Sequence, residues 1–258
     1  MRYALTNGII LNGKKDMEPI KGLTIIVEDG KIIDITDKEI ENIKIIDLNN
    51  RYVLPGLINM HVHLPGSGMP KDTNRQNKKS VDKLLSHKLT RYIVYKLCAK
   101  YAKIELLSGV TTIRTVGGLA DIDSKIRDNI KKGKLVGPRI LASNMALSVP
   151  GGHMAGILAY EATDEESAVK YIEKINETHP DLIKLMITGG VLDAKKKGEP
   201  GELKMSPEII KAACDKAHAL GYKVAAHVES TLGVKLALEN GVDTIEHGAK
   251  LTSDIIKL

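Results

Sequence analysis

Four short apolar segments of this chain carry, at or near their carboxyl ends, side chains of types that bind metal ions. A helical pattern follows each segment. The side chains belong to His61, His63, Lys184, His227 and His247. In parallel α/β barrels the functional side chains lie at the carboxyl ends of the strands, on loops that lead into the helices. The recurrence therefore predicts a parallel barrel in which these five side chains share one site.

An alternation of strand and helix patterns supports the barrel from residue 57 onwards. The expected strands are 57–60, 110–115, 138–143, 181–187, 223–227 and 242–246. The expected helices are a long one that ends near 109, then 122–132, one from 164, one from 206, and 231–240. These are about six units of a (β/α)8-type barrel. A doubly wound sheet is disfavoured, because Gly66 and Gly68 follow two histidines and a proline rather than forming a phosphate-binding turn.

The first expected helix contains an apolar stripe with residues spaced by threes and fours. The stripe consists of Leu85, Leu89, Ile93, Leu97, Tyr101 and Ile104. This spacing is typical of a helix that turns one face toward a core. We expect the stripe to face the core of the barrel.

Residues 1–56 have a different pattern, with short apolar segments and tight turns. Strands are expected at 23–27, 31–35 and 43–47, and the Asp29-Gly30 pair is typical of a hairpin turn between the first two. Pro55-Gly56 marks the passage to the next strand. The sequence thus predicts a small N-terminal β annex, part of a β-sandwich, over 1–56, and an incomplete barrel over 57–258.

Composition narrows the class of protein. A chain of 258 residues that is 43% hydrophobic can bury a large core. The net charge of +6 comes mainly from 71–103, where a solvated helix face is expected rather than a nucleic-acid site, since the chain has no Trp or Phe to stack on bases. The sequence shows no secretory signal and no apolar run of the roughly 20 residues that span a bilayer, so we expect a cytoplasmic protein without membrane contact. Cys98 and Cys214 are expected to be buried thiols.

The His61-Val62-His63 segment follows an apolar strand directly. Alternate residues of a strand point to the same face, so both imidazoles should face the barrel mouth while Val62 faces the helices. A His-x-His pair alone is a weak indication, because histidines are often hydrogen-bonded structural residues. The same alternative applies to His227 and His247 taken singly, but not easily to the whole set.

Lys184 lies between apolar residues in an expected strand. Burial disfavours the ammonium form, so its pKa should fall and a neutral amine become available. Such an amine can take up carbon dioxide as an N-carboxylate, which offers anionic oxygens to metal ions. The alternative is a lysine that reaches solvent or pairs with a carboxylate.

Taken together, these segments resemble the amidohydrolase superfamily. The matching text is Pro55 to His63, Gly109 to Arg114, Gly137 to Ser143, Ile183 to Met186, Ala226-His227 and Thr244 to Gly248. Within the superfamily, the chain is most similar to the group that includes imidazolonepropionase and the metal-dependent Xaa-Pro, Xaa-Arg and Xaa-Lys dipeptidases. The resemblance covers almost the whole chain, and its motifs are less specific for substrate than for superfamily.

The resemblance implies two divalent metal ions, which in this family are generally zinc. His61 and His63 would hold one ion, His227 and His247 the other, and N-carboxylated Lys184 would bridge them. A hydroxide shared by the ions would attack the amide carbonyl. His153, in Gly151-Gly152-His153, looks like the family's loop histidine that contacts the substrate, although a solvated loop histidine is an equal alternative. Glu229 could face the same mouth, but in many relatives an aromatic residue or a histidine stands there.

The family's general acid and base, an aspartate at the end of strand eight, has no counterpart in these residues. Asp254 is the last acid of the sequence, but Ser253-Asp254 is typical of a helix start. The catalytic acid and base is therefore unknown, and we expect these residues alone to be inactive. An unclosed parallel sheet would leave bare edges. We accordingly expect either a missing C-terminal segment or a homo-oligomer.

The sequence therefore favours a metal-dependent hydrolase that cleaves an amide bond of a small molecule, either a dipeptide or an N-acyl amino acid. One alternative is a hydrolase of cyclic amides, similar to imidazolonepropionase. The other is a truncated or non-catalytic barrel protein without the strand-eight aspartate. The intact set of five ligand-type side chains counts against a non-catalytic protein.

Overall fold

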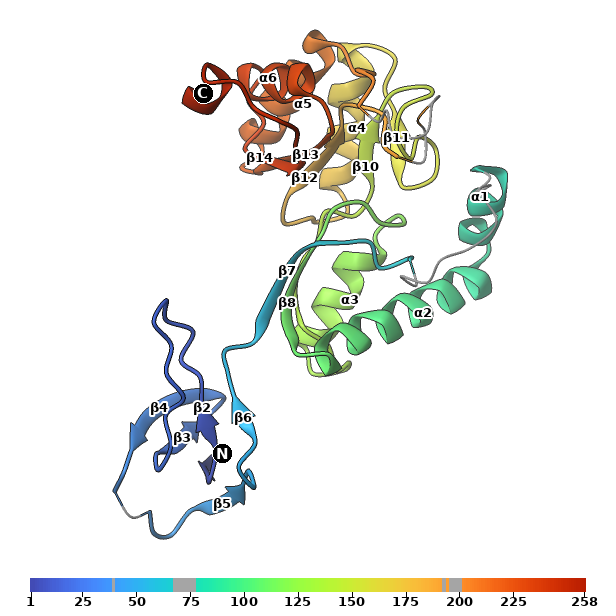
Figure 1. Cartoon of the computed structure of the whole chain (residues 1–258). Helices are drawn as coiled ribbons and strands as arrows, with labels where there is room; N and C mark the ends of the chain where they lie inside the picture. Colours follow the sequence, from blue (N-terminus) through green and yellow to red (C-terminus); the bar gives the residue numbers. More distant parts are fainter. Residues whose placement is uncertain (39, 67–77, 192–193, 195–200) are drawn as a thin grey trace. The chain divides into compact units, whose positions relative to one another are not determined.

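The computed structural model of the chain describes residues 1–38, 40–66, 78–191, 194 and 201–258 (Figure 1). Residues 67–77, which hold Gly68 and the start of the predicted basic segment, lie outside the described residues. The chain divides into two compact units, Met1–Leu57 and Ile58–Leu258. The assignment of these units to a β-sandwich and an incomplete barrel stays a prediction.

The first unit is built on a small sheet with the strand order β4-β3-β1-β5. Its strands are β1 (Arg2–Thr6), β3 (Thr24–Glu28), β4 (Lys31–Thr36) and β5 (Lys44–Asp47). The predicted turn joins β3 to β4, with Asp29 and Gly30 at φ angles of 49° and 77°. The sequence did not indicate β1, nor the short pair β2 (Ile9–Ile10) and β6 (Tyr52–Val53). Ile10, Ile25 and Val27 form the buried core of this unit.

The second unit contains two sheets. In one the order is β7-β8-β9, and in the other it is β11-β10-β12-β13-β14, with every pair of neighbours in the second sheet parallel. The strands of the first sheet are β7 (Leu57–Val62), β8 (Val110–Thr115) and β9 (Arg139–Leu141). Those of the second are β10 (Ala146–Ser148), β11 (Ala159–Glu161), β12 (Ile183–Met186), β13 (Val224–Val228) and β14 (Thr244–His247). The predicted α/β class with parallel strands is confirmed, and the described residues form two open sheets rather than one closed barrel.

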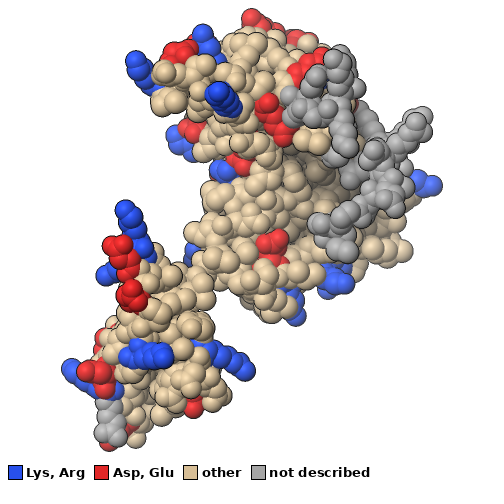
Figure 2. All heavy atoms as spheres, viewed as in Figure 1, with Lys and Arg blue, Asp and Glu red and all other residues tan. Residues whose placement is uncertain are grey.

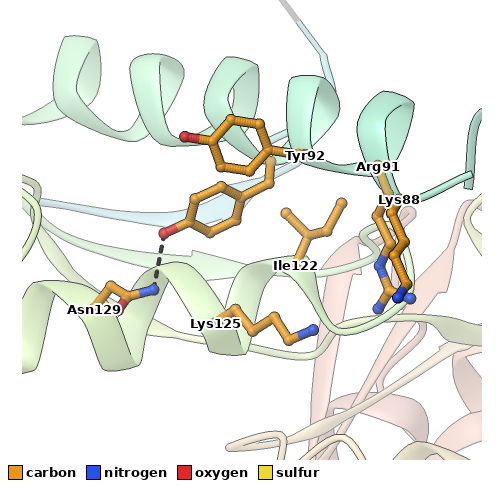
Figure 3. A pocket seen from close by; sticks show the side chains of 7 residues that line it. Lys88, Arg91, Tyr92, Ile122, Lys125 and Asn129 are labelled. Carbon is orange, nitrogen blue, oxygen red and sulfur yellow. Dashed lines mark hydrogen bonds between the residues drawn. The ribbon is translucent and has the colours of Figure 1, made fainter.

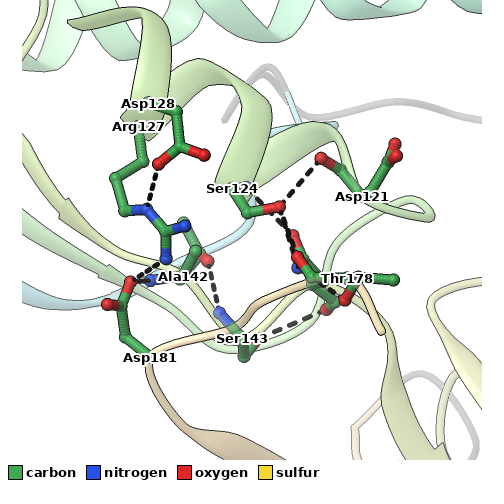
Figure 4. A network of polar contacts seen from close by, with 10 residues as sticks. Asp121, Ser124, Arg127, Asp128, Ala142, Ser143, Thr178 and Asp181 are labelled. Atoms are coloured by element: carbon green, nitrogen blue, oxygen red, sulfur yellow. Dashed lines mark hydrogen bonds and ion pairs between the residues drawn. The ribbon is translucent and has the colours of Figure 1, made fainter. Parts of the chain in front are cut away.

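The two sheets meet where β9 ends and β12 approaches. The predicted strand 138–143 stops after Leu141, because Asn144 adopts a left-handed φ of 56°, and β10 starts two residues later. The Asp181 amide donates to the Ala142 carbonyl at 2.6 Å, and the Asp181 carboxylate accepts from the Ala142 amide at 2.8 Å. The same carboxylate pairs with Arg127 at 2.7 Å (Figure 4). These contacts connect both sheets and the helix that carries Arg127.

Helices follow the strands of the second unit in the predicted alternation. They are α1 (Lys78–Ser86), α2 (Lys88–Leu107), α3 (Ile122–Lys131), α4 (Glu165–Asn176), α5 (Pro207–Ala219) and α6 (Thr231–Glu239), with a short 3-10 helix η1 (Ile255–Lys257). Helix α4 begins at Asp164 with a capping box to Ser167, and α5 begins at Ser206 with Pro207 at its first turn. These starts were readable from the sequence because the capping residues are local.

The prediction for the first helix is wrong both in the number of helices and in the face that is buried. The segment forms two helices, separated at His87, instead of one. The apolar stripe is also largely exposed, with Leu89 at 71% and Ile93 at 57% of their maximal accessibility, whereas Cys98 and Ala102 are fully buried. Val94, Tyr95 and Ala99 pack against the same buried cluster, so the covered face of α2 is the one beside the predicted stripe.

The exposed surface carries both signs of charge. On the face that Figure 2 shows, Lys and Arg side chains are interspersed with Asp and Glu. Among the described residues, exposed side chains form ion pairs one helical turn apart, such as Glu166 with Lys170 and Lys211 with Asp215. Among the described helices, none combines the length and the apolar character needed to cross a lipid bilayer.

The contact of Asp181 with Arg127 and Ala142 predicts a measurable contribution to stability. Replacing Asp181→Asn keeps an acceptor for the Ala142 amide but removes one of the two charged partners of the buried Arg127, which also pairs with Asp128, so the free energy of unfolding should fall by about 2 kcal/mol. Urea unfolding followed by circular dichroism measures the change. The Glu166→Gln control breaks an exposed pair and should change little. An equal effect of both variants would contradict this role.

Candidate functional site

His61 and His63 lie at the carboxyl end of β7, with their rings 5.1 Å apart between centroids. Val62 is 9% exposed and belongs to the apolar core that contains Cys98 and Ala102. The two imidazoles therefore lie on the face of the strand opposite to Val62, as the alternation in a strand requires. Their Nε2 atoms are 3.2 Å apart.

The hydrogen-bond partners of the two rings fix where their protons lie. His63 Nδ1 is 2.9 Å from the Gly117 carbonyl, and His61 Nδ1 is 2.7 Å from the Glu246 carboxylate. Both partners can only accept, so each Nδ1 carries a proton, and in the neutral rings each Nε2 presents a lone pair. Two lone pairs at this distance repel unless a cation lies between them. Nitrogens bound to one tetrahedral zinc ion are roughly 3.3 Å apart, which matches the observed separation.

The left-handed backbone at Gly117 helps to bring His63 into place. Gly117 has a φ of 126°, which disfavours any residue with a side chain. A Cβ atom there would lie 3.3 Å from the Met186 methyl group and 3.4 Å from the His63 ring. The absence of that atom allows the Gly117 carbonyl and the ring to approach closely.

Lys184 lies in the middle of β12 and is fully buried. Its Nζ has no hydrogen-bond partner, so neither alternative of a solvent-exposed or carboxylate-paired lysine describes it. Burial lowers its pKa to about 7, with a smaller lowering by Arg114 and an opposing effect of Glu246. The predicted fall in pKa is therefore present, and a large fraction of the amine is neutral near neutral pH.

His227 and His247 end the neighbouring strands β13 and β14. Their ring centroids are 4.9 Å apart, and Val228 and His247 are paired across the two strands. The Nε2 atom of His227 is buried and has no hydrogen-bond partner. Burial lowers the pKa of His227 to about 3, assisted by His153 and Lys184. Burial likewise lowers the pKa of His63 to about 4, so both rings are neutral at neutral pH.

The five histidines form one continuous set of ring contacts. The His61 and His247 centroids are 4.7 Å apart, and the His153 ring stacks on His227 at 4.2 Å. With the contacts of His61 to His63 and of His247 to His227, the set runs without a gap. The charge of Lys184 affects the pKa of His63, His227 and His247, which places the lysine beside the set. The structure thus brings together all six predicted site residues, while their roles stay predictions.

Two charged residues of the site were not recognised from the sequence. Glu246 is 5% exposed on β14, and it pairs with Arg114 of β8 as well as with His61. Burial alone would raise the pKa of Glu246, but its hydrogen bond with His61 and the charges of Lys184 and Arg114 lower it. A charged residue inside each of two strands, β8 and β14, was the available signal.

Glu229 and Asp254 differ in their relation to the site. Glu229 has a buried, unpartnered Oε2, and it offers a ligand atom within 4.8 Å of those of His227 and His247. Asp254 is fully exposed and precedes η1, so it is a helix start, as predicted. Within the described residues, β14 is the last strand, and no strand-end aspartate follows it.

The described part of the second unit includes two hollows. One, of about 390 Å³, is lined by His61 and His63 together with Tyr101 and Glu105. The other, of about 440 Å³, lies between α2 and α3 and contains no predicted site residue (Figure 3). Its lining consists of Lys88, Arg91, Tyr92, Tyr95, Ile122, Lys125 and Asn129. Asp121 pairs with both Arg91 and Lys125, which offsets much of the positive charge beside this hollow.

The chain is similar to several known proteins. The sequence model described as "Amidohydrolase family" matches residues 52–258. The structure of a candidate prolidase from Bifidobacterium longum is similar over 99% of this chain and 56% of its own, with 32% identity and a TM-score of 0.77. A Xaa-Pro dipeptidase with bound methionine in the active site is similar over 100% of this chain and 64% of its own, with 26% identity and a TM-score of 0.77.

An uncharacterised protein of Mycobacterium tuberculosis is 26% identical over 249 residues, which are 96% of this chain and 53% of that protein. The chain therefore spans about half to two thirds of the length of the relatives that it matches.

The low pKa values of the buried histidines predict a pH-dependent stability of the metal-free protein. His227 has a pKa near 3 in the folded chain and near 6.5 when unfolded, so below pH 6.5 the unfolded state binds the proton first. The unfolding free energy should therefore fall as the pH decreases from 7 to 5, and His227→Asn should reduce that slope. Urea unfolding at both pH values measures it. His87→Asn, at an exposed position, should keep the wild-type slope; a His227→Asn variant that also keeps it would contradict the prediction.

Proposed function

Because the chain belongs to the amidohydrolase family, we propose that the protein is a metal-dependent hydrolase that cleaves an amide bond of a small molecule. The observation that carries the proposal is the pair of Nε2 atoms of His61 and His63, 3.2 Å apart, with both Nδ1 atoms held by acceptors. A histidine pair with a purely structural role would be more stable if one ring donated a hydrogen bond to the other. Here the acceptors hold both Nδ1 protons, so a pair of neutral rings has two Nε2 lone pairs close together, which suits a cation.

The remaining donors fit a second ion. His227 offers a buried, unpartnered Nε2, and the adjacent ring of His247 lies toward His61. Imidazole nitrogen with oxygen ligands suits zinc. We propose that His61 and His63 hold one ion and that His227 and His247 hold the other.

The buried amine of Lys184 supports its proposed carboxylation. The neutral amine attacks carbon dioxide, a nitrogen–carbon bond forms as one carbon–oxygen double bond becomes single, and one N–H proton leaves, so that a neutral group is replaced by an anion. Beside bound metal ions, such an anion would offset part of their positive charge and would supply two oxygens as ligands. The unpartnered Nζ and its pKa of about 7 are the observations that favour the reaction.

Bound ions supply a Lewis acid for the amide carbonyl and lower the pKa of water. The chain's own side chains then bind and orient the substrate. His153, stacked on His227, can direct a ring nitrogen toward the carbonyl of a bound amide. The family resemblance assigns the proton transfer to the leaving amine to a strand-end aspartate, and within the described residues no such aspartate follows β14. Residues 1–258 alone are accordingly expected to show little turnover.

The proposed substrate is a dipeptide or an N-acyl amino acid. The names of two structural relatives, a candidate prolidase and a Xaa-Pro dipeptidase, favour dipeptides over cyclic amides. A panel that contains dipeptides, N-acyl amino acids and ring amides, tested with the complete protein, should show the highest kcat/KM for an open-chain amide. Preference for a ring amide would reject this substrate class but keep the metal-dependent hydrolase.

The metal centre has a direct test. The complete protein should contain two divalent ions per chain by elemental analysis, and ¹³C-labelled bicarbonate should give a carbamate signal that Lys184→Met abolishes. The same variant should lose metal affinity and activity, because the bridging oxygens are absent. Lys170→Met, on an exposed helix face, is the control and should keep both. Protein without bound divalent ions and with an unmodified Lys184 would refute the proposal.

A further inference from the structure

Glu246 forms a junction between three strands of the second unit. Its Oε2 accepts from His61 Nδ1 of β7 at 2.7 Å, and its Oε1 forms an ion pair with Arg114 of β8. Both partners are themselves inside the protein, with 30% and 12% of their side chains exposed. The hydrogen bonds that a carboxylate accepts are strong when it is buried this deeply, because little water competes for its oxygens.

Arg114 holds the carboxylate in place with the rest of its guanidinium. Its Nε donates to the carbonyl of Met60, the residue before His61, at 2.9 Å. A second nitrogen donates to Thr244 on β14 at 3.3 Å. The guanidinium is therefore bound to the strand that carries His61 and to the strand that carries Glu246, so it fixes the position of one relative to the other.

We propose that Glu246, held by Arg114, is a positioning residue that keeps His61 in the tautomer with the Nε2 lone pair free for a metal ion. The inference rests on the proposed function, because it assigns a role at the proposed metal site. The imidazole of His61 differs in this respect from that of His63, whose Nδ1 proton goes to the Gly117 carbonyl. A carboxylate at Nδ1 makes the Nε2 atom of an imidazole a stronger electron donor to a metal ion than a carbonyl at Nδ1 does. Metal binding by His61 should therefore depend more on its hydrogen-bond partner than metal binding by His63.

A second arginine–carboxylate pair in the same unit provides a matched comparison. Arg127 and Asp181 are also largely buried, with 8% and 28% of their side chains exposed, and they also connect different elements. The second contact of Asp181, however, is the Ala142 amide and not a histidine. Loss of this pair should reduce stability without any effect on the tautomer of His61.

The test compares Glu246→Gln with Asp181→Asn in the complete protein, after metal removal and titration with Zn²⁺. In Glu246→Gln, the affinity of one of the two ions should fall by about 10–100-fold while the other ion binds as in the wild type. Long-range ¹H–¹⁵N spectra of the metal-free protein should show His61 with a free Nε2 in the wild type and in Asp181→Asn. In Glu246→Gln, they should show a mixture of tautomers.

A further variant covers the case in which Glu246→Gln does not fold. Arg114→Gln leaves the hydrogen bond between Glu246 and His61 possible but removes the ion pair. The affinity for one of the two ions should therefore fall by less than in a folded Glu246→Gln variant and by more than in Asp181→Asn. Wild-type affinity for both ions in the variants that fold, with an unchanged His61 tautomer, overturns the positioning role and leaves the metal-dependent hydrolase intact. A wild-type protein that binds no Zn²⁺ overturns both.

Discussion

The buried carboxylate of Glu246 is the contact on which the proposed site depends, because it joins strands that are not paired by their backbones. In the described residues, β7 and β8 belong to one sheet and β14 to the other. Two hydrogen bonds between Ala142 and Asp181, one to the Ala142 carbonyl and one to the Asp181 carboxylate, connect the sheets on one side. On the other side, the side chains of Glu246 and Arg114 make the connection. The ligand-type residues are thus distributed over two sheets whose spacing is set by a few buried polar contacts.

The same burial that costs stability prepares the site for metal. Burial is the largest cause of the lowered pKa of His63, His227 and Lys184, and it favours their neutral forms. Neutral imidazoles and a neutral amine are the forms that bind a cation or react with carbon dioxide. Without ions, these groups add little to stability and leave polar atoms such as Lys184 Nζ unpartnered. Buried polar atoms elsewhere in a fold normally have hydrogen-bond partners, whereas functional sites commonly contain polar atoms without them, as this candidate site does.

The sequence predicts the features that depend on neighbouring residues better than the contacts between residues far apart in the chain. The helix starts at Asp164 and Ser206 depend on neighbours within three residues, and they were predicted correctly. The same holds for the orientation of Val62 relative to the two histidines beside it. The face of α2 was predicted wrongly, because an apolar stripe does not reveal which side the rest of the chain covers. The bond between His61 and Glu246 joins residues 185 positions apart, and the pair of Arg114 with Glu246 spans 132. No periodicity within a strand can indicate such partners.

The distribution of ligands over two sheets also limits what each half of the site can do alone. His61 and His63 are fixed by partners on β14 and after β8, whereas His227 and His247 end paired strands of the other sheet. The ring contact of His61 with His247, at 4.7 Å between centroids, is where the two halves meet. Glu246 precedes His247 in the chain and bonds to His61, so one short strand influences both halves. A change in the position of β14 would therefore alter the orientation of one histidine and the location of the other together, which couples the two proposed ion positions through the backbone of a single strand.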